Sequence, residues 1–393
     1  HQETKHSFRR YARSSGYLDW AAQPDPFRRY HGAPLVPLRF SRNDASPSYD
    51  DLFIPGAVPS RPVDPGTLAE FFEFSLALSA WKQYEGSRWA LRINPSSGNL
   101  HPTEGYLVIG PVEGLHDRHG VYHYTPKEHA LERRAEFSTR AWDALVEGFP
   151  WGTFLAALTS IHWREAWKYG ERAYRYCQHD AGHALAAWTV SAALQGWRAS
   201  LLQTWSDADI AALLGLGRAD DFADAEREQP DLLVAVVPSP SAGVVHPAAT
   251  LETLADIAHS SWLGRANRLS KDHVEWRLID AVADAGVKPT TEPPAAVEID
   301  SWGPPLPPHR PPHSARNIIR QRRSAVAFDG VTSLPAAPFY LMLDRVLPRQ
   351  DRMPWSTFGS PACVHLALFV HRVVGLDAGL YFLLRRRDKL ADL

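Results

Sequence analysis

Cysteine is scarce in this sequence. Cys177 and Cys363 are the two cysteines among its 393 residues. Two thiols exclude a scaffold built on several disulfides and a zinc site made of four thiolates. The cytoplasm is therefore the expected location. The chain begins at His1 without a methionine and without a visible signal peptide. We expect the natural N-terminus to lie further upstream, which leaves export open.

Long apolar runs and an excess of one charge are also missing. The stretch ALAAWTVSAAL, between His183 and Gln195, reaches only about half of the roughly 20 apolar residues that a membrane-spanning helix needs. The formal net charge of -2 gives no overall attraction to nucleic acid or to an anionic membrane, so we expect neither as a partner. With 45% hydrophobic and 22% charged residues, the composition is typical of a soluble globular protein of two or three domains.

Helical and strand patterns are both present. Thr67 and Glu70 have the spacing of a capping box and precede a largely apolar segment. Four segments have helical patterns: 67–81, 176–197, 206–217 and 252–286. Four segments favour strands: 105–109, 120–124, 231–237 and 364–370. Because helices outnumber strands in this interpretation and lie between them, we expect an α+β fold.

An internal repeat lies on both sides of a proline-rich segment. Before that segment the chain reads GYLVIGPVEGLHDRHGVYHYTPKEHAL, and after it LALFVHRVVGLDAGLYFLLRRRDKL. Both give an apolar strand, Val-x-Gly-Leu, Gly-[Val/Leu]-Tyr and a charged turn, which implies a duplicated domain. The predicted divisions are a first domain (1–250), a helical connector (251–287), a proline-rich linker (288–313) and the N-terminal part of an incomplete second domain (314–393).

The repeat pairs two turns of different chemistry. Pro95-Ser96-Ser97-Gly98-Asn99 precedes the strand of the first copy, and Ser356-Thr357-Phe358-Gly359-Ser360 precedes the strand of the second. Such residues are common in simple connections, because Pro fixes φ, Gly permits a positive φ, and Ser and Asn bond nearby backbone. If the turn only joined two elements, either version would serve. The difference therefore favours a ligand at one copy.

The stretch PSSGN, followed by Pro and a strand, resembles the flavin-contacting loop of the nitroreductase family. Together with HQETKHS, GLHDRHGVYHY and WKYGERAYRY in the same order, it makes the chain similar to the SagB-type dehydrogenase branch in its tandem form. The resemblance implies a nitroreductase-like, FMN-dependent α+β fold, duplicated as an intramolecular pseudo-dimer with the second copy incomplete. In such dimers the turn of one protomer lies against FMN held largely by the other. Further oligomerisation stays open.

The resemblance also assigns the cofactor contacts. Residues of the turn would contact the flavin ring and ribityl chain: Pro95, Ser96, Ser97 and Asn99. Backbone at Gln203 and Thr204 would lie near flavin N5. The family's phosphate-binding Arg-x-Ser-x-Lys/Arg is matched by Arg322 and Ser324, with Val326 in place of the later cation, and less closely by Ser7 and Arg9. The first copy contains the family's turn, and the second copy contains the better match to its phosphate-binding pattern. We therefore predict one composite site and one FMN per chain.

Lys168 and Tyr169, in WKYGERAYRY, match the Lys-Tyr pair of SagB-type azoline dehydrogenases. The resemblance implies that they act as acid and base during a two-electron hydride transfer. Either NAD(P)H drives the reduction of a small molecule, or a substrate such as a peptide heterocycle is itself dehydrogenated. The alternative is structural, because a basic aromatic run before a helix can simply cover apolar surface.

Other interpretations stay open. A basic cluster consists of Arg316, Arg320, Arg322 and Arg323, and within it the segment from Arg320 to Arg323 can be only the solvated end of a helix. A flavin-binding scaffold without catalysis would explain the altered second turn and Val326. A metal-dependent hydrolase could use His179 and His183, which share a helix face, although no third ligand can be identified and we expect no metal.

Overall fold

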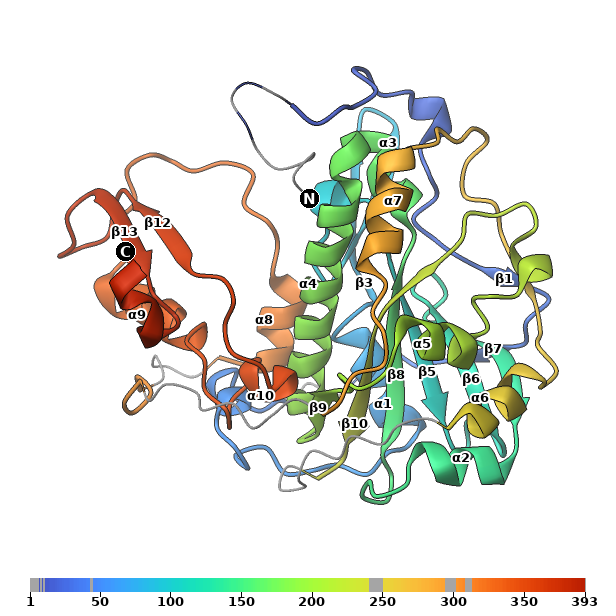
Figure 1. Ribbon diagram of the computed structural model, residues 1–393. Helices are drawn as coiled ribbons and strands as arrows, with labels where there is room; N and C mark the ends of the chain where they lie inside the picture. Colours follow the sequence, from blue (N-terminus) through green and yellow to red (C-terminus); the bar gives the residue numbers. More distant parts are fainter. Residues whose placement is uncertain are drawn as a thin grey trace.

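A seven-stranded antiparallel sheet lies at the centre of the protein (Figure 1). The computed structural model describes residues 7, 9, 11–42, 45–239, 250–293, 302–307 and 313–392. Across the sheet the strands follow the order β2 (Leu35–Pro37), β7 (Ala130–Phe137), β6 (His119–Thr125), β5 (Thr103–Ile109), β8 (Phe154–Ser160), β10 (Gln229–Val237) and β9 (Arg198–Leu201).

Helices cover both faces of this sheet. Along β5, Leu107 packs into one helical layer while Tyr106 and Val108 pack into the other, as the two-residue period of a strand requires. Burial on both faces explains the nearly continuous apolar runs of β5, β8 and β10. One layer consists of α1 (Pro65–Glu73) and α4 (Ala173–Leu194), and the other of α2 (Thr139–Leu145), α5 (Asp207–Leu214) and α6 (Leu251–Ala258).

Smaller elements surround the layers. Beside the N-terminal part of α4, α3 (His162–Tyr169) and α7 (Arg277–Gly286) share an apolar cluster that includes Trp167 and Ile279. Two further strand pairs are β1 (Tyr30–His31) with β11 (Arg265–Ala266), and β3 (Leu78–Tyr84) with β4 (Ser87–Arg92). Short 3-10 helices are η1 (Trp20–Ala22), η2 (Asp50–Phe53), η3 (Ser97–Asn99), η4 (Gly170–Arg172), η5 (Ala219–Phe222) and η6 (Arg387–Asp392).

The C-terminal part contains a separate hairpin. This part of the chain comprises α8 (Ala315–Gln321), α9 (Ala336–Arg345), α10 (Trp355–Phe358), β12 (Leu366–Val370) and β13 (Gly379–Leu383), and β12 pairs with β13 to form the hairpin. Figure 1 shows α8 beside α4, whereas β12, β13 and α9 lie away from the large sheet. The hairpin resembles β5–β6 in detail, because Gly114 and Gly375 occupy the same turn position with φ of 81° and 80°. In the two paired turns, Gly98 and Gly359 both have a φ of 59°.

The predicted strands and the helices α4 and α5 are confirmed. The helix predicted over 67–81 ends at Glu73, and its N-cap is Asp64 with Thr67 as the third residue of the capping box. The following residues form β3–β4 around Glu85 and Gly86, whose positive φ values fit a two-residue hairpin turn. Only the two ends of 252–286 are helical, as α6 and α7.

In the described part of the chain, helices outnumber the thirteen strands only when the six 3-10 helices are counted with the ten α-helices, because several strands are not predicted. The strand β7, with the sequence ALERRAEF, shows why sequence patterns miss some strands. Its Glu132 and Arg134 are buried and paired, so the segment does not have the alternation of apolar and polar residues that signals a strand.

Two ion pairs attach α8 to α1. Buried Arg316 donates from Nη2 to Glu70 Oε2 at 2.7 Å, and Arg320 donates from Nη2 to Glu73 Oε1 at 2.6 Å. The interpretation of Arg320 as part of a solvated helix end is therefore wrong, because its guanidinium is paired with Glu73. Burial raises the pKa of Glu70, but hydrogen bonds led by that of Arg316 outweigh it, so the pKa lies below its usual value.

Replacing Arg316 by Met should lower the free energy of unfolding by about 2 kcal/mol, because it removes the buried arginine from the Glu70 carboxylate and leaves that carboxylate paired with Arg61, whose side chain is 39% exposed. The matched control is Arg320→Met, which removes a pair whose arginine is 34% exposed and should cost less than about 1 kcal/mol. Urea unfolding followed by tryptophan fluorescence measures both. If the two variants lose the same free energy of unfolding, the Arg316–Glu70 pair does not contribute more than the exposed Arg320–Glu73 pair, which would contradict this prediction.

Candidate functional site

The Pro95–Asn99 turn is held from inside by Asp180 of α4. Ser96 Oγ donates to Asp180 Oδ2 at 2.6 Å, and the N–H and Oγ of Ser97 both donate to Oδ1 at 2.9 Å. Asn99 Nδ2 donates to the carbonyl of Ala90 at 2.9 Å. The serine hydroxyls thus face α4, and Gly98 is the exposed residue of the turn. Burial raises the pKa of Asp180, although the bonds from both serines oppose that rise.

Gly98 brings this turn against the end of α3. With its φ of 59°, an added Cβ would lie 2.8 Å from Tyr169 Oη and 3.1 Å from Lys168 Nζ. Residues about 70 positions apart in the sequence therefore form one site. The Lys168 ammonium lies 5.5 Å from the centre of the Tyr169 ring. The centre of that ring is 4.4 Å from the centre of the Tyr176 ring, and the two rings are tilted by 40°.

Behind the lysine and tyrosine lies Glu165, which the sequence analysis did not single out. It is fully buried on α3, and neither carboxyl oxygen has a hydrogen-bond partner in the described structure. Burial, and then the proximity of Asp180, raise the pKa of Glu165 to about 9, while Lys168 opposes the rise. The one usable sequence signal was the spacing in WREAWKY, which places Glu165 on the same helix face as Lys168 and Tyr169.

Arg322 reaches the base of the same turn. Its Nη2 donates to the carbonyl of Ile93 at 3.1 Å, two residues before Pro95. Partial burial, and then repulsion by Arg323, lower the pKa of Arg322. Ser324 follows on an exposed stretch that includes Val326. The structure therefore places one predicted phosphate-binding residue beside the predicted flavin-contacting turn.

Gln203 and Thr204 lie elsewhere, at the second turn. Gln203 Nε2 donates to the carbonyl of Phe358, and Ser360 Oγ donates to Gln203 Oε1 at 3.1 Å. The hydroxyl of Thr291 donates to the carbonyl of Gln203 at 2.8 Å, and its N–H donates to that of Thr204 at 3.2 Å. These hydrogen bonds hold Gln203 and Thr204 between the second turn and the start of the proline-rich segment.

The two turns contact α4 at separate places. The first turn bonds to Asp180, whereas Thr357 Oγ1 of the second is 3.1 Å from Thr189 Oγ1. Nine residues of helix separate these contacts, which is about 13 Å along the axis. The predicted cofactor residues thus form two groups, and the structure does not join Gln203 and Thr204 to the first turn.

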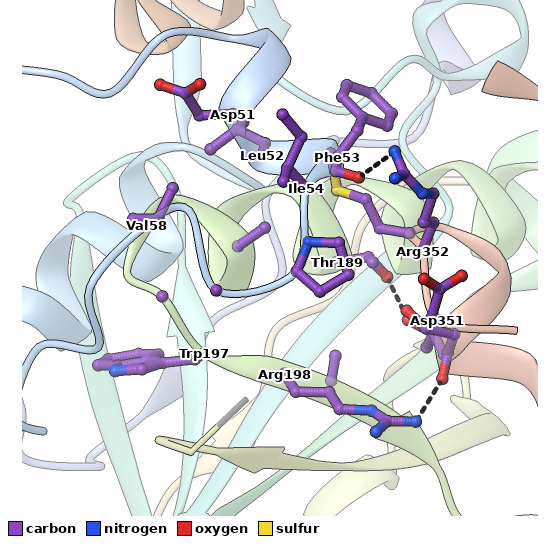
Figure 2. A pocket seen from close by; sticks show the side chains of 18 residues that line it. Asp51, Leu52, Phe53, Ile54, Val58, Thr189, Trp197, Arg198, Asp351 and Arg352 are labelled. Carbon is purple, nitrogen blue, oxygen red and sulfur yellow. Dashed lines mark hydrogen bonds between the residues drawn. The ribbon is translucent and has the colours of Figure 1, made fainter. Parts of the chain in front are cut away.

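A small cavity adjoins the second turn (Figure 2). Its walls come from η2, from the C-terminal end of α4 and from the second turn. Arg198 Nη2 donates to the carbonyl of Ser356 at 3.3 Å, and Arg352 Nη1 donates to that of Phe53 at 3.0 Å. The cavity volume of about 100 Å³ is well below the roughly 300–1,000 Å³ typical of ligand pockets. It has no room for a flavin-sized ligand.

The remaining candidate residues lie at the surface. The N–H of Arg9 is 3.3 Å from Ser7 Oγ, and within the described residues the structure joins this pair to no other part of the site. His179 and His183 are exposed on α4, with His183 Nδ1 4.0 Å from Asp180 Oδ1. Among the residues that the structure describes, no three His, Cys, Asp or Glu side chains form a group that could hold a metal ion. No helix of that same part is long and apolar enough to cross a membrane.

The comparison with protein families identifies the central part of this chain. Residues 59–223 match the family model described as Nitroreductase family. This segment is similar to the nitroreductase family. It contains the first turn, Lys168–Tyr169, Asp180 and Gln203–Thr204. The family match implies an oxidoreductase, and such proteins are in general FMN-dependent.

Several solved structures are similar to this chain. A protein of Anabaena variabilis that is classed with the nitroreductases has a TM-score of 0.62 at 19% identity, with 97% of this chain and 78% of that chain covered. A protein of Ralstonia eutropha in the same class has a TM-score of 0.39 at 14% identity (57% and 97% covered). The E. coli microcin synthetase McbBCD complex with truncated pro-MccB17 has a TM-score of 0.36 at 21% identity (51% and 70% covered).

The similarity to the Anabaena protein shows the fold alone, and it confirms the predicted nitroreductase-like α+β class. A search of curated protein sequences gives no significant match.

Proposed function

We propose that this nitroreductase-type chain is an FMN-dependent oxidoreductase that transfers two electrons as hydride. One observation carries the proposal: three distant segments meet at the first turn. Gly98 contacts Lys168 and Tyr169, and Arg322 donates to the backbone just before Pro95. A connecting turn would not need a basic residue, a phenol and a guanidinium from separate elements around it.

The residues present fit an FMN. Gly98 is exposed and lacks a side chain, so a flat ring can approach the backbone of the turn closely. Of the five N–H groups of the Arg322 guanidinium, one is engaged by Ile93, which leaves donors for an anionic phosphate. A phosphate would also relieve the repulsion between Arg322 and Arg323. Ser324 would add its hydroxyl, and Pro95 and Asn99 would border the ring.

When bound, FMN would supply the atom that gives or takes the hydride. The chain supplies the proton chemistry. Burial, followed by Glu165 and Tyr176, raises the pKa of Tyr169, so its phenol holds a proton at neutral pH and can donate it. Lys168 makes no ion pair within the described residues, so its side chain is available to exchange a proton with a substrate.

The second turn does not offer an equivalent site. Phe358 stands where the first turn has Ser97, its carbonyl is taken by Gln203, and the adjacent cavity is too small. The matched hairpins and the matched φ of Gly98 and Gly359 support a duplicated chain in which the two copies form an intramolecular pseudo-dimer. One FMN per chain follows from this asymmetry.

For the substrate we propose two directions of the same chemistry. NAD(P)H can reduce the site, which then reduces a small acceptor molecule. Alternatively, a substrate such as a peptide azoline is oxidised, as the resemblance of Lys168–Tyr169 to SagB-type dehydrogenases suggests. Both directions of the reaction would use Lys168, Tyr169 and the first turn.

The first test is the visible absorption of the purified protein, with release and identification of the chromophore. We expect oxidised FMN at about one per chain. Arg322→Leu should weaken FMN binding at least tenfold, because a charge-assisted hydrogen bond contributes about 1.5–3 kcal/mol. Ser360→Ala, in the second turn, is the control and should leave the affinity unchanged.

A protein that stays colourless when FMN is added would overturn the proposal. Full turnover by Lys168→Met and by Tyr169→Phe would instead show that this pair has no catalytic role.

A further inference from the structure

Glu165 is the chemically most unusual group near the site. Its side chain is fully buried, and both carboxyl oxygens are without hydrogen-bond partners in the described structure. An ionised carboxylate in that position would be costly, because burial removes its hydration and nothing replaces it. Lys168 and Tyr169 follow three and four residues later, on the same face of α3.

The groups packed against Glu165 offer no compensation. From α4, Asp180 and the buried thiol of Cys177 face it. Asp180 already accepts hydrogen bonds from Ser96 and Ser97, and its negative charge disfavours ionisation of Glu165. Burial, followed by Glu165, also raises the pKa of Cys177, which therefore stays a neutral thiol. From α3 itself, the positive charge of Lys168 favours ionisation of Glu165.

We propose that Glu165 is a positioning residue that stays protonated beside Lys168, so that the lysine points at the Gly98 turn instead of pairing with a carboxylate. The geometry supports this role. Lys168 Nζ lies where a Cβ on Gly98 would be 3.1 Å away, and the described residues give it no ion pair. The inference deepens the proposed function and rests on it only for the role of Lys168.

The arrangement has a consequence at alkaline pH. When Glu165 loses its proton to solvent, its carboxylate gains an attraction for the ammonium three residues further along the helix. Lys168 would then be drawn away from the turn. The change should occur near pH 9, where the Glu165 carboxyl titrates.

Difference infrared spectroscopy tests the protonation state without requiring any flavin. Wild-type protein should show the carbonyl stretch of a buried protonated carboxylic acid at pH 7, and that band should disappear with a midpoint near pH 9. The band should be missing from Glu165→Gln. Absence of such a band from the wild type at pH 7 would overturn the proposal, whatever the outcome of FMN binding.

A second variant keeps the test independent of Glu165→Gln. Asp180→Asn removes the neighbouring negative charge but keeps an acceptor for the serines, so the midpoint of the Glu165 band should move to lower pH. Cys177→Ala, which removes a neutral thiol, is the control and should leave the midpoint in place. An unchanged midpoint in Asp180→Asn contradicts the proposal.

The pH profile of turnover is the readout that a purely structural role would not move. In the wild type the rate should fall above about pH 9, as Lys168 becomes paired. In Glu165→Gln this alkaline fall should be missing, whatever the absolute rate. A fall of the same shape in both proteins would show that Glu165 does not position Lys168.

Discussion

Gly98→Ala should weaken FMN binding and turnover by more than tenfold. The φ of 59° already disfavours a side chain at this position, by roughly 1 kcal/mol. The new methyl group would also lie 2.8 Å from Tyr169 Oη and 3.1 Å from Lys168 Nζ. Either the turn or the two side chains must move, so the contact that assembles the proposed site is lost. Titration with FMN, followed by its fluorescence, gives the affinity.

The repeat provides a matched control for that substitution. Gly359 has the same φ of 59°, but an added Cβ would find its nearest neighbour, Gln203 Nε2, at 3.6 Å. Gly359→Ala therefore carries the same backbone cost without the collision. It should reduce stability by about 1 kcal/mol and leave FMN affinity within twofold. If the two variants lose affinity equally, contact of Gly98 with Lys168 and Tyr169 is not what builds the site.

The sequence predicts the parts of this site better than their assembly. The turn and Lys168–Tyr169 are recognisable because each is a short continuous pattern. Asp180 and Glu165 are not, because their roles depend on burial and on contacts between α3, α4 and the turn. The family resemblance assigns Gln203 to the flavin, but its partners in the structure are Phe358, Ser360 and Thr291, which only the folded chain brings to it.

The same contrast holds for the sheet. Strands made of apolar residues, such as β5 and β10, were predicted because they are buried on both faces. The strand β7 was missed because charged residues within it are buried in pairs. Nothing local in ALERRAEF shows that Glu132 has a histidine partner on the neighbouring strand. Pairing between distant residues is the information that a single sequence does not contain.

His123→Gln should lower the free energy of unfolding by about 3–5 kcal/mol at pH 6. His123 lies in the middle of the sheet, with Nδ1 2.9 Å from Glu132 Oε2 and Nε2 3.0 Å from Glu104 Oε2. All three side chains are at most 1% exposed. Glutamine can keep a hydrogen bond to one carboxylate but carries no charge. Two buried carboxylates would then lose their shared cation.

The pKa of His123 determines in which direction its contribution to stability changes with pH. Burial lowers the pKa of His123, but hydrogen bonds to Glu104 and Glu132 more than compensate and raise it to about 9 from an ordinary value of 6.5. A raised pKa means that this stabilisation is complete below pH 6.5 and is lost as the pH rises through 9. The wild type should therefore lose about 3 kcal/mol between pH 6 and pH 9.5. Urea unfolding at both pH values measures the loss.

In His123→Gln that pH-dependent loss should be missing, and the two proteins should approach each other in stability at pH 9.5. His31→Gln, at an exposed position, is the control and should follow the wild type. A His123→Gln variant that keeps the full slope would show that the imidazole is not charged in the sheet.

A loss of stability toward acidic pH should remain in all three proteins, smaller in His123→Gln, because Arg164 still pairs with Glu104 in that variant. Burial raises the pKa of Glu104, but Arg164 and His123 lower it to about 2, so its contribution is present above pH 4.5 and is lost toward pH 2. Arg164 donates to Glu104 and, at 2.8 Å, to the carbonyl of His101, which directly follows the turn region. Arg164 belongs to α3, the helix that ends at Lys168 and Tyr169. The buried charges of the sheet thus fix the helix that carries the proposed acid–base pair.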